Sequence, residues 1–407
     1  MIRLTRFLSF GLSGTLLRLF YTIFLWELGF GLYINNMLTV YLEEHGMTAA
    51  RVGLVLTIAG LGRIILLLPV GSLMDHIGRK PVVVTSAFIA IPGALGYAFF
   101  SNQWILAICT VVMSINALGF PAMSGIIADT PAENPTDVFR KLYTIGPAIA
   151  FIIGPTVGGK IGDLVSNQAV FLLCAVVFAG AFLLALSLTE PAMSNRGTTR
   201  GNYMEIVRYH PLRMVVFYAF CLVFVLSFGV TFLPNLLTDR HNFSDLQRGI
   251  AFSFGAVGTL VLSIVMSRIP SMTHIRGSAL GVLCVTGICV MPLLTGNPWV
   301  LVPAFMMRGG FMFAWSLVTP LANDISPRHL KERTFAGIEF STGIGNTIAP
   351  VLAGLAFQFH QALPFVIGAI AMPLVAFGAL FLERTVFAPV LARNRTETGP
   401  RAEPGIV

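Results

Sequence analysis

The chain has very little charge. Asp, Glu, Lys and Arg together make up 11% of its 407 residues, whereas hydrophobic residues make up 56%. The mean hydropathy of +0.82 reflects this imbalance. A water-soluble protein covers its surface with far more charged side chains. The composition therefore excludes a soluble globular protein and indicates a protein that spans a membrane.

Residue patterns that bind cofactors or carry covalent chemistry are also missing. No glycine-rich phosphate loop precedes a lysine, and no serine stands in a nucleophile elbow. The five cysteines all fall in apolar stretches, without metal-ligand or disulfide spacing: Cys109, Cys174, Cys221, Cys284 and Cys289. We therefore expect no enzyme, no ATP-driven pump, no metal site and no cofactor. The N-terminus lacks a short apolar run followed by a cleavage site, so we expect no removed signal peptide.

Long apolar stretches are what the sequence has in abundance. A transmembrane helix needs about 20 mostly apolar residues to cross roughly 30 Å of hydrocarbon. The sequence predicts twelve such spans, which lie near residues 15–41, 51–70, 81–100, 103–127, 141–162, 168–189, 213–237, 249–268, 278–295, 299–321, 335–358 and 362–382.

The net charge of +8 comes from basic residues that gather on one side of the predicted spans. With both termini in the cytoplasm, twenty of the 26 Lys and Arg residues lie in cytoplasmic loops and tails, and four lie on the opposite face. Cytoplasmic loops of membrane proteins carry such an excess of bases. The positive charge therefore reports orientation in the membrane, and we expect no nucleic-acid partner.

The longest polar break between spans covers residues 190–212 and divides the spans into two sets of six. An internal repeat supports this division. Asp129 lies 26 residues before Pro155, and Asp324 lies 26 residues before Pro350, so the offset between the halves is 195 residues. Two such repeats are common in transporters. We predict an N-terminal bundle, a cytoplasmic linker, a C-terminal bundle and a disordered cytoplasmic tail, over residues 1–190, 191–212, 213–383 and 384–407.

A cluster of charge and glycine separates the second and third predicted spans. Residues 71–81 contain the order G-x-L-x-D-x-x-G-R-K, which resembles the loop between helices two and three of major facilitator superfamily transporters. The resemblance implies the fold of that superfamily: an all-α integral membrane protein with twelve transmembrane helices in two six-helix bundles and both termini cytoplasmic. It also implies transport of a solute, with the binding site at the interface of the two bundles.

The charged turn is a candidate conformational latch. Gly71 and Gly78 permit a close helix approach and a tight turn, and Asp75 can meet the positive N-terminal end of another helix. In the resembling family, this aspartate docks against the start of helix eleven, and the arginine pairs with an acid at the end of helix four. Carried over here, Asp75 meets the start of span eleven, and Arg79 reaches Asp129. Such a latch favours the outward-open state; the alternative is a plain topology anchor.

A second motif lies in span five. Gly154-Pro155-x-x-Gly158-Gly159 resembles the glycine-proline motif of antiporters in the same superfamily. Small residues let this span pack tightly against a partner, and the proline permits a bend. The family's motif has a further glycine where this chain has Ala150. Plain helix packing is the alternative interpretation.

Four ionisable residues fall inside the spans. Each would cost roughly 2.5–3.5 kcal/mol at the bilayer centre unless it is paired or hydrated. Glu27 is the candidate proton-coupling acid, with Arg63 as its proposed partner, although such a pair can also be purely structural. Arg308 either receives an anionic substrate or pairs with Glu339 or Glu27. Glu339 stands near the start of span eleven and is assigned to the latch.

The candidate substrate cavity is aromatic and apolar. We assign to it five residues besides Arg308: Tyr33, Asn35, Asn36, Asn116 and Trp315. A sugar or nutrient-ion carrier would need more converging amides and charges, so the pocket suits a hydrophobic or amphipathic molecule. The arginine that antiporters of the resembling family usually carry on helix four is missing from residues 113–119, which argues against proton antiport.

The sequence thus favours a secondary transporter of the multi-pass cell-membrane type, as in the inner membrane of a bacterium. We expect a monomer in the lipid bilayer that exports a hydrophobic or amphipathic small molecule in exchange for protons, like the drug/proton antiporters of the superfamily. Two alternatives within transport are a lipid or glycolipid flippase and proton-coupled uptake of a small anion. A non-transporting membrane receptor is the alternative from another class.

Overall fold

The computed structural model describes residues 11, 12, 14–131, 135–190, 205, 208–269, 272–327 and 330–391. The predicted linker at 191–204 and the end of the predicted tail, at 392–407, lie outside these ranges. In the described ranges every regular element is a helix. The helices before residue 190 are α2 Gly14–Gly31, α3 Leu38–Glu44, α4 Ala49–Ile77, α5 Arg79–Phe99, α6 Gln103–Ile115, η1 Asn116–Leu118, α7 Gly119–Asp129, α8 Pro135–Arg140, η2 Lys141–Ile145, α9 Gly146–Leu164 and α10 Asn167–Leu186.

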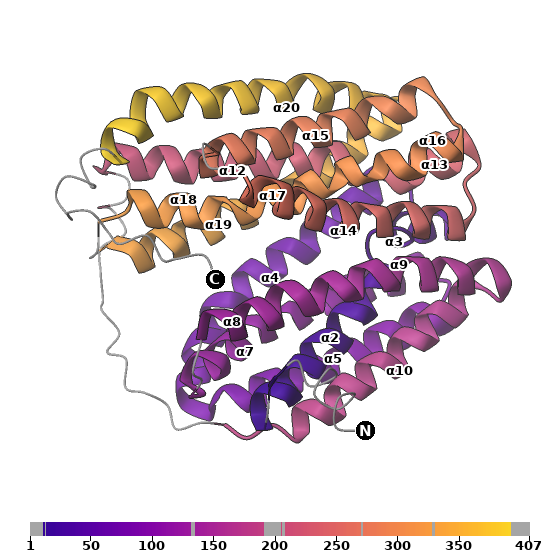
Figure 1. The fold of residues 1–407 in the computed structure, drawn as a ribbon. Helices are drawn as coiled ribbons and strands as arrows, with labels where there is room; N and C mark the ends of the chain where they lie inside the picture. The colour runs from indigo at the N-terminus through magenta and orange to yellow at the C-terminus, as the bar shows by residue number, and fades with distance from the viewer. Residues whose placement is uncertain are drawn as a thin grey trace.

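The helices after residue 208 repeat this pattern of long and interrupted rods (Figure 1). They are α12 His210–Val230, α13 Leu233–His241, α14 Asp245–Ser267, α15 His274–Leu294, α16 Pro298–Ala304, η3 Phe305–Gly309, α17 Gly310–Ser316, α18 Val318–Ile325, α19 Lys331–Phe359, α20 Leu363–Leu382 and η5 Glu383–Phe387.

Eleven helical segments among the described residues are long and apolar enough to cross a membrane. The helix α2, expected as the first of twelve spans, is not one of them, because Arg18 and Glu27 lower the hydropathy of its 18 residues. At 1.5 Å per residue α2 is about 27 Å long, close to the thickness of the hydrocarbon. The predicted span 15–41 is also not one helix, since a turn over residues 32–37 separates α2 from α3.

Two predicted boundaries differ from the structure. Residues 210–212, predicted as linker, begin α12. Residues 384–391, predicted as the start of a disordered tail, continue the last helix, in which Phe387 is fully buried. The apolar side chains in this short stretch dock on the bundle, and composition alone gave no sign of that docking.

The spans at 103–129 and 298–325 share an irregular middle. The 3₁₀ turn η1 separates α6 from α7, and the 3₁₀ turn η3 separates α16 from α17. In the second case Pro303 removes a backbone donor, and the consecutive Gly309 and Gly310 weaken the helix. A 3₁₀ segment inside a long helix marks a point where the rod can bend.

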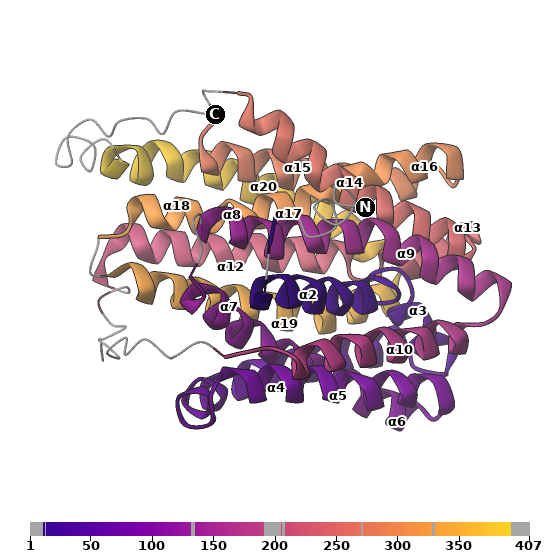
Figure 2. The same cartoon turned by 60° about the horizontal axis from the view of Figure 1, so that its bottom comes forward.

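The helices form two groups, one on each side of residues 191–204. Figure 1 shows the first group, coloured indigo to magenta, below the second, coloured rose to yellow. In Figures 1 and 2 alike, α3, α13 and α16 lie at one end of the molecule, and α7, α8 and α18 lie at the other. We refer to these as the α3–α13 end and the α7–α18 end. The most extensive contacts between the groups join α4 to α19 and α9 to α14.

These two contacts are related by the internal repeat. A Cβ added at Gly53 of α4 would overlap the carbonyl oxygen of Pro350 on α19, and one added at Gly249 of α14 would overlap that of Pro155 on α9. The two glycines are 196 residues apart in the chain and the two prolines are 195 residues apart. The two crossings are therefore related by the offset of the internal repeat.

Candidate functional site

Contacts between the groups are densest at the α3–α13 end. Asp163, in the last turn of α9, accepts hydrogen bonds from the backbone N–H of Asp245 at 2.9 Å and from that of Leu246 at 3.1 Å. These N–H groups begin α14 and have no partner within their own helix. A carboxylate at the positive end of a helix is stabilising. A residue of the first group thus caps a helix of the second.

Arg248 ties the same end together from inside. It is 2% exposed, and its Nε donates to the backbone carbonyl of Asn36 at 3.1 Å, across the two groups. Its remaining bonds stay within its own group: Nη2 pairs with Asp245, and Nη1 donates to Thr238 and to the carbonyl of Phe243. Sequence reasoning had counted Arg248 only as a loop charge, because its partners lie as far as 212 residues away.

Glu43, on α3, completes this end. The side-chain amide of Asn235 on α13 donates to its Oε2 at 2.5 Å. Burial, the largest cause, and the nearby charge of Asp239 raise the pKa of Glu43, whereas the hydrogen bond from Asn235 lowers it, and together they move the pKa from 4.5 to about 7. The carboxyl therefore titrates near neutral pH at a point where the groups meet. The sequence gave no signal for this site, since it lies in a short loop helix.

Arg308 lies at the middle of the molecule, in η3. Its Nη2 donates to Oδ1 of Asn35, from the other group, at 3.2 Å, and its guanidinium carbon lies 4.5 Å from the centroid of the Phe252 ring. Its Nε is buried without a hydrogen-bond partner among the described residues. The structure thus brings the two predicted cavity residues Arg308 and Asn35 together, and it gives Arg308 no ion pair with Glu339 or Glu27.

Glu27 stands apart from Arg63. The Glu27 side chain is half-buried on α2 and makes no hydrogen bond or ion pair within the described part of the chain. It lies close enough to Tyr143 for its charge to act on the phenol. The phenol oxygen of Tyr143 is hydrogen-bonded to the hydroxyl of Ser124 at 2.8 Å. The predicted Glu27–Arg63 pair is therefore not formed here.

Arg63 instead interacts with Glu339. The two side chains, on α4 and α19, are exposed, and each charge acts on the other without closing to ion-pair distance. Charged side chains inside membrane spans face water or protein, because facing lipid is too costly. Both side chains lie on the α7–α18 side of the contact between α4 and α19 at Gly53.

Three other cavity candidates are buried inside their helix groups. Tyr33 is 1% exposed and packs on Phe171 with ring centroids 5.5 Å apart, and Asn116 is 0% exposed and donates to the carbonyl of Ser86 at 2.9 Å. Contrary to the sequence prediction, both stabilise the core in this conformation. Asn36 is 1% exposed, with both amide atoms unpartnered. Trp315 is 39% exposed and remains a candidate.

The charged turn between α4 and α5 forms the expected ion pair. Nη1 of Arg79 pairs with Asp129, whose side chain is 4% exposed. Gly78 takes a φ of 87°, which favours glycine. Glu190, which sequence reasoning missed, accepts from the backbone N–H of Arg79 at 2.5 Å and so caps α5. The other two latch candidates, Gly71 and Asp75, belong to α4, but their surroundings lie outside what the structure describes.

The helix-five motif lies at a junction of three helices. Gly154 packs against the backbone of Gly31, and Gly158 packs against that of Leu32, so both hold α9 close to the end of α2. Pro155 and Gly159 face the other way, against the start of α14. The motif thus packs α9 against the end of α2 on one side and against α14 of the other group on the other side, as the packing interpretation expects.

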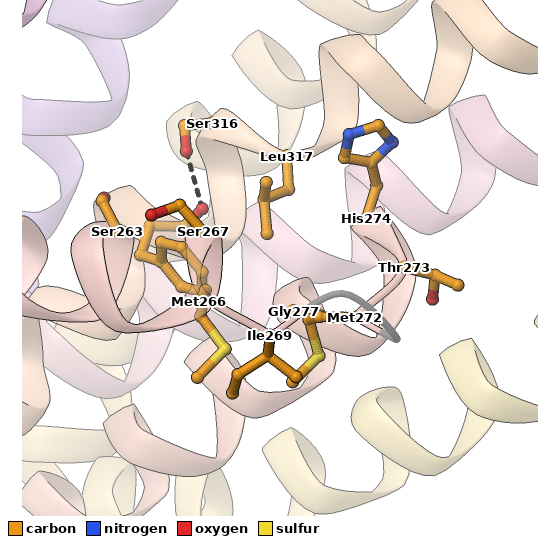
Figure 3. Close-up of a pocket in the computed structure, with 11 residues that line it drawn as sticks. Ser263, Met266, Ser267, Ile269, Met272, Thr273, His274, Gly277, Ser316 and Leu317 are labelled. Carbon is orange, nitrogen blue, oxygen red and sulfur yellow. Dashed lines mark hydrogen bonds between the residues drawn. The ribbon is translucent and has the colours of Figure 1, made fainter. Parts of the chain in front are cut away.

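A separate pocket of about 480 Å³ lies near the α7–α18 end, between α14, α15 and α17 (Figure 3). Met266, Ile269 and Met272 gather on one side of it, and Ser263, Ser267 and Ser316 on another. No predicted site residue lines this pocket. Within the described ranges, no group of three or more His, Cys, Asp or Glu side chains is placed to hold a metal ion.

Solved structures with the same fold are transport proteins. The chain matches the nucleoside transporter NupG with a TM-score of 0.72, covering 94% of this chain and 100% of that one at 14% identity. It also matches a bacterial homologue of the human lysosomal transporter Spinster, solved in an inward-facing and unoccupied conformation, with a TM-score of 0.65 at 16% identity over 96% and 98% of the two chains.

Two curated relatives cover nearly the whole chain. Quinolone resistance protein NorA of Staphylococcus aureus is 26% identical over 391 residues, which are 92% of this chain and 98% of NorA. Multidrug resistance protein 1 of Bacillus subtilis is 24% identical over 86% of this chain and 92% of that protein. A sequence model described as Major Facilitator Superfamily matches residues 19–336.

Proposed function

Because the chain belongs to the major facilitator superfamily, a family of membrane transporters and not of enzymes, we propose that it exports a hydrophobic or amphipathic small molecule in exchange for protons. The protein is a multi-pass protein of the cell membrane, and its substrate is a small molecule. Export, the coupling ion and the substrate class are the proposed parts.

The observation that carries the proposal is the nearly complete coverage of two resistance proteins. Resistance by a transporter requires removal of the toxic compound from the cell. The alignment with NorA extends over 98% of that protein, so all the spans needed for export have counterparts here. A flippase or a receptor has no comparable support.

Glu27 is the proposed proton carrier. It is half-buried in α2, lacks an ion-pair partner among the described residues and lies beside Tyr143. A carboxyl in such a place can exist neutral or ionised as its hydration changes. As the helix groups open to one side or the other, water reaches it from that side, which couples protonation to the change of access.

The described contacts fit a conformation that opens to the cytoplasm. The hydrogen bonds found between the groups run from Asp163 and Glu43 at the α3–α13 end to Asn35 at the middle. Beyond the middle, Arg63 and Glu339 are exposed. We assign the α3–α13 end to the outside because most bases lie at the other end.

Reconstituted liposomes test the proposal. With an imposed pH gradient, the wild type should accumulate an amphipathic fluorescent dye against its concentration gradient. Protons should move across the membrane in the opposite direction to the dye. Glu27→Gln should lose accumulation and keep dye exchange at equal pH, because the substitution removes the titrating group only. Glu205→Gln is the matched control: Glu205 is exposed outside the spans and accepts from Arg333 at 2.9 Å, a hydrogen bond that the glutamine oxygen can still accept, so the variant should behave as wild type. Dye flux without proton movement in the wild type would refute proton coupling.

A further inference from the structure

Arg308 differs from the other well-packed arginines of this chain. Arg79 pairs with Asp129, Arg248 pairs with Asp245, and each carboxylate balances its guanidinium. Around Arg308, the amide oxygen of Asn35 and the ring of Phe252 stand where the other two arginines have a carboxylate, and Arg308 forms no ion pair among the described residues.

The arrangement leaves donors free. A guanidinium carries five N–H groups and cannot lose its charge in a protein. Of these, one Nη2 hydrogen goes to Asn35, and the Nε–H is buried without a partner. A buried unpaired donor costs about 1–3 kcal/mol, more for a charged group. A residue that serves only to hold helices together would be expected to have its charge matched, as Arg79 and Arg248 do.

The surroundings of Arg308 belong to both groups of helices. Asn35 comes from the turn after α2, while Phe252 comes from α14, one turn before Gly255, whose missing side chain leaves room beside the Arg308 stem. Asn36, next to Asn35, has both amide atoms buried without a hydrogen-bond partner among the described residues, so a second polar side chain there is also unsatisfied. A compact anion would match the unpaired charge and donors of Arg308.

We propose that Arg308 binds the carboxylate of an amphipathic substrate. The Nε–H and Nη groups present the fork that a carboxylate accepts in two parallel hydrogen bonds. The ring of Phe252, which is 3% exposed and packs on Phe305, covers one face of the guanidinium and helps to fix its orientation. Asn35 holds the guanidinium in place while the site is empty. The inference rests on the transport function proposed above and names the substrate class for it.

Equilibrium binding to the purified full-length protein in detergent tests the proposal without transport. The probes are 2-naphthoate and its methyl ester, which share the ring and differ in the charge. Wild type should bind the acid roughly 10- to 100-fold more tightly than the ester, the range expected for hydrogen bonds to a charged group. Arg308→Gln should bind both probes equally, and Arg308→Lys should keep part of the preference.

Asn35→Asp provides a second variant that keeps the arginine. The new carboxylate would stand where the amide oxygen lies, 3.2 Å from Nη2, and would compete with the substrate anion. We expect it to lose the preference for the acid and to keep ester binding. Arg51→Gln, which removes an exposed arginine in the first turn of α4, is the matched control and should leave the preference unchanged.

The outcomes separate this inference from the transport proposal. Equal binding of acid and ester by wild type, absence of acid binding up to its solubility limit, or an unchanged preference in Arg308→Gln would overturn the role of Arg308. A preference that depends on Arg308, found together with no proton-driven dye movement in liposomes, would support the binding site and refute only the coupled export.

Discussion

At the scale of single residues, the ionisable side chains divide into those with a partner and those without. Arg79 and Asp129 form the pair that the family resemblance implied. Glu27 and Arg63 do not pair, because α4 presents Arg63 toward α19, where Glu339 stands. Which face of α4 meets which helix depends on packing between groups, so the sequence could place the charges in spans but could not choose their partners.

Glu43 gives a residue-scale prediction for pH. Its pKa is raised by burial to about 7 where α3 meets α13, whereas a hydrated glutamate titrates near 4.5. The closed α3–α13 end therefore binds the proton more tightly than an open end. Closure should be fully favoured below about pH 4.5 and should weaken as the pH rises to about 7. Glu43→Gln should weaken the pH dependence of closure in this window, and the neighbouring Glu44, whose pKa burial also raises, accounts for what remains.

Distances between spin labels at positions 164 and 299, both strongly exposed at this end, measure the closure. Native cysteines are replaced first, and the labels are attached to Leu164→Cys and Trp299→Cys. The control is Glu205→Gln on the same labelled background. A pH profile that is the same with and without Glu43 would contradict this role.

At the scale of elements, crossings of paired helices set where the groups meet. Gly53 lies against Pro350, and Gly249 lies against Pro155, through backbone contacts that leave no space for a side chain. The sequence revealed the prolines and their equal spacing, and it predicted tight packing of span five. It did not reveal the glycines as partners, because nothing local marks contacts between residues that lie 297 or 94 positions apart in the chain.

Larger residues at these crossings should keep the α3–α13 end open. Gly53→Val and Gly249→Val each place a branched side chain against a backbone carbonyl, so the helices must separate. The distance between labels at 164 and 299 should lengthen, and transport should fall strongly. Gly378→Val on α20 is the control, since a side chain there meets no atom within 4 Å. If all three substitutions changed the label distance and transport equally, the two glycine crossings would have no specific role in closing the α3–α13 end.

At the scale of the whole molecule, hydrogen bonds join the two groups of helices at the α3–α13 end. Bases gathered at the α7–α18 end predict that this end is cytoplasmic. An impermeant maleimide added to intact cells should label Leu164→Cys, 73% exposed at the α3–α13 end. It should label Ile269→Cys, at the other end of α14, only after the cells are opened. Reversed labelling would invert the assigned topology.

The amino-acid sequence by itself determined the membrane class, the family, the repeat and the pair between Arg79 and Asp129. The membrane class follows from composition and loop charge, the repeat from the equal spacings in the two halves, and the family and the pair from the resemblance of the charged turn. Only the tertiary structure decided that Arg308 meets Asn35, that Asp163 caps α14 and that Tyr33 is core. The reason is physical, because an apolar span packs as favourably against lipid as against another span. Hydrophobicity therefore determines that a span lies in the membrane, whereas close backbone packing and polar partners determine which spans become its neighbours.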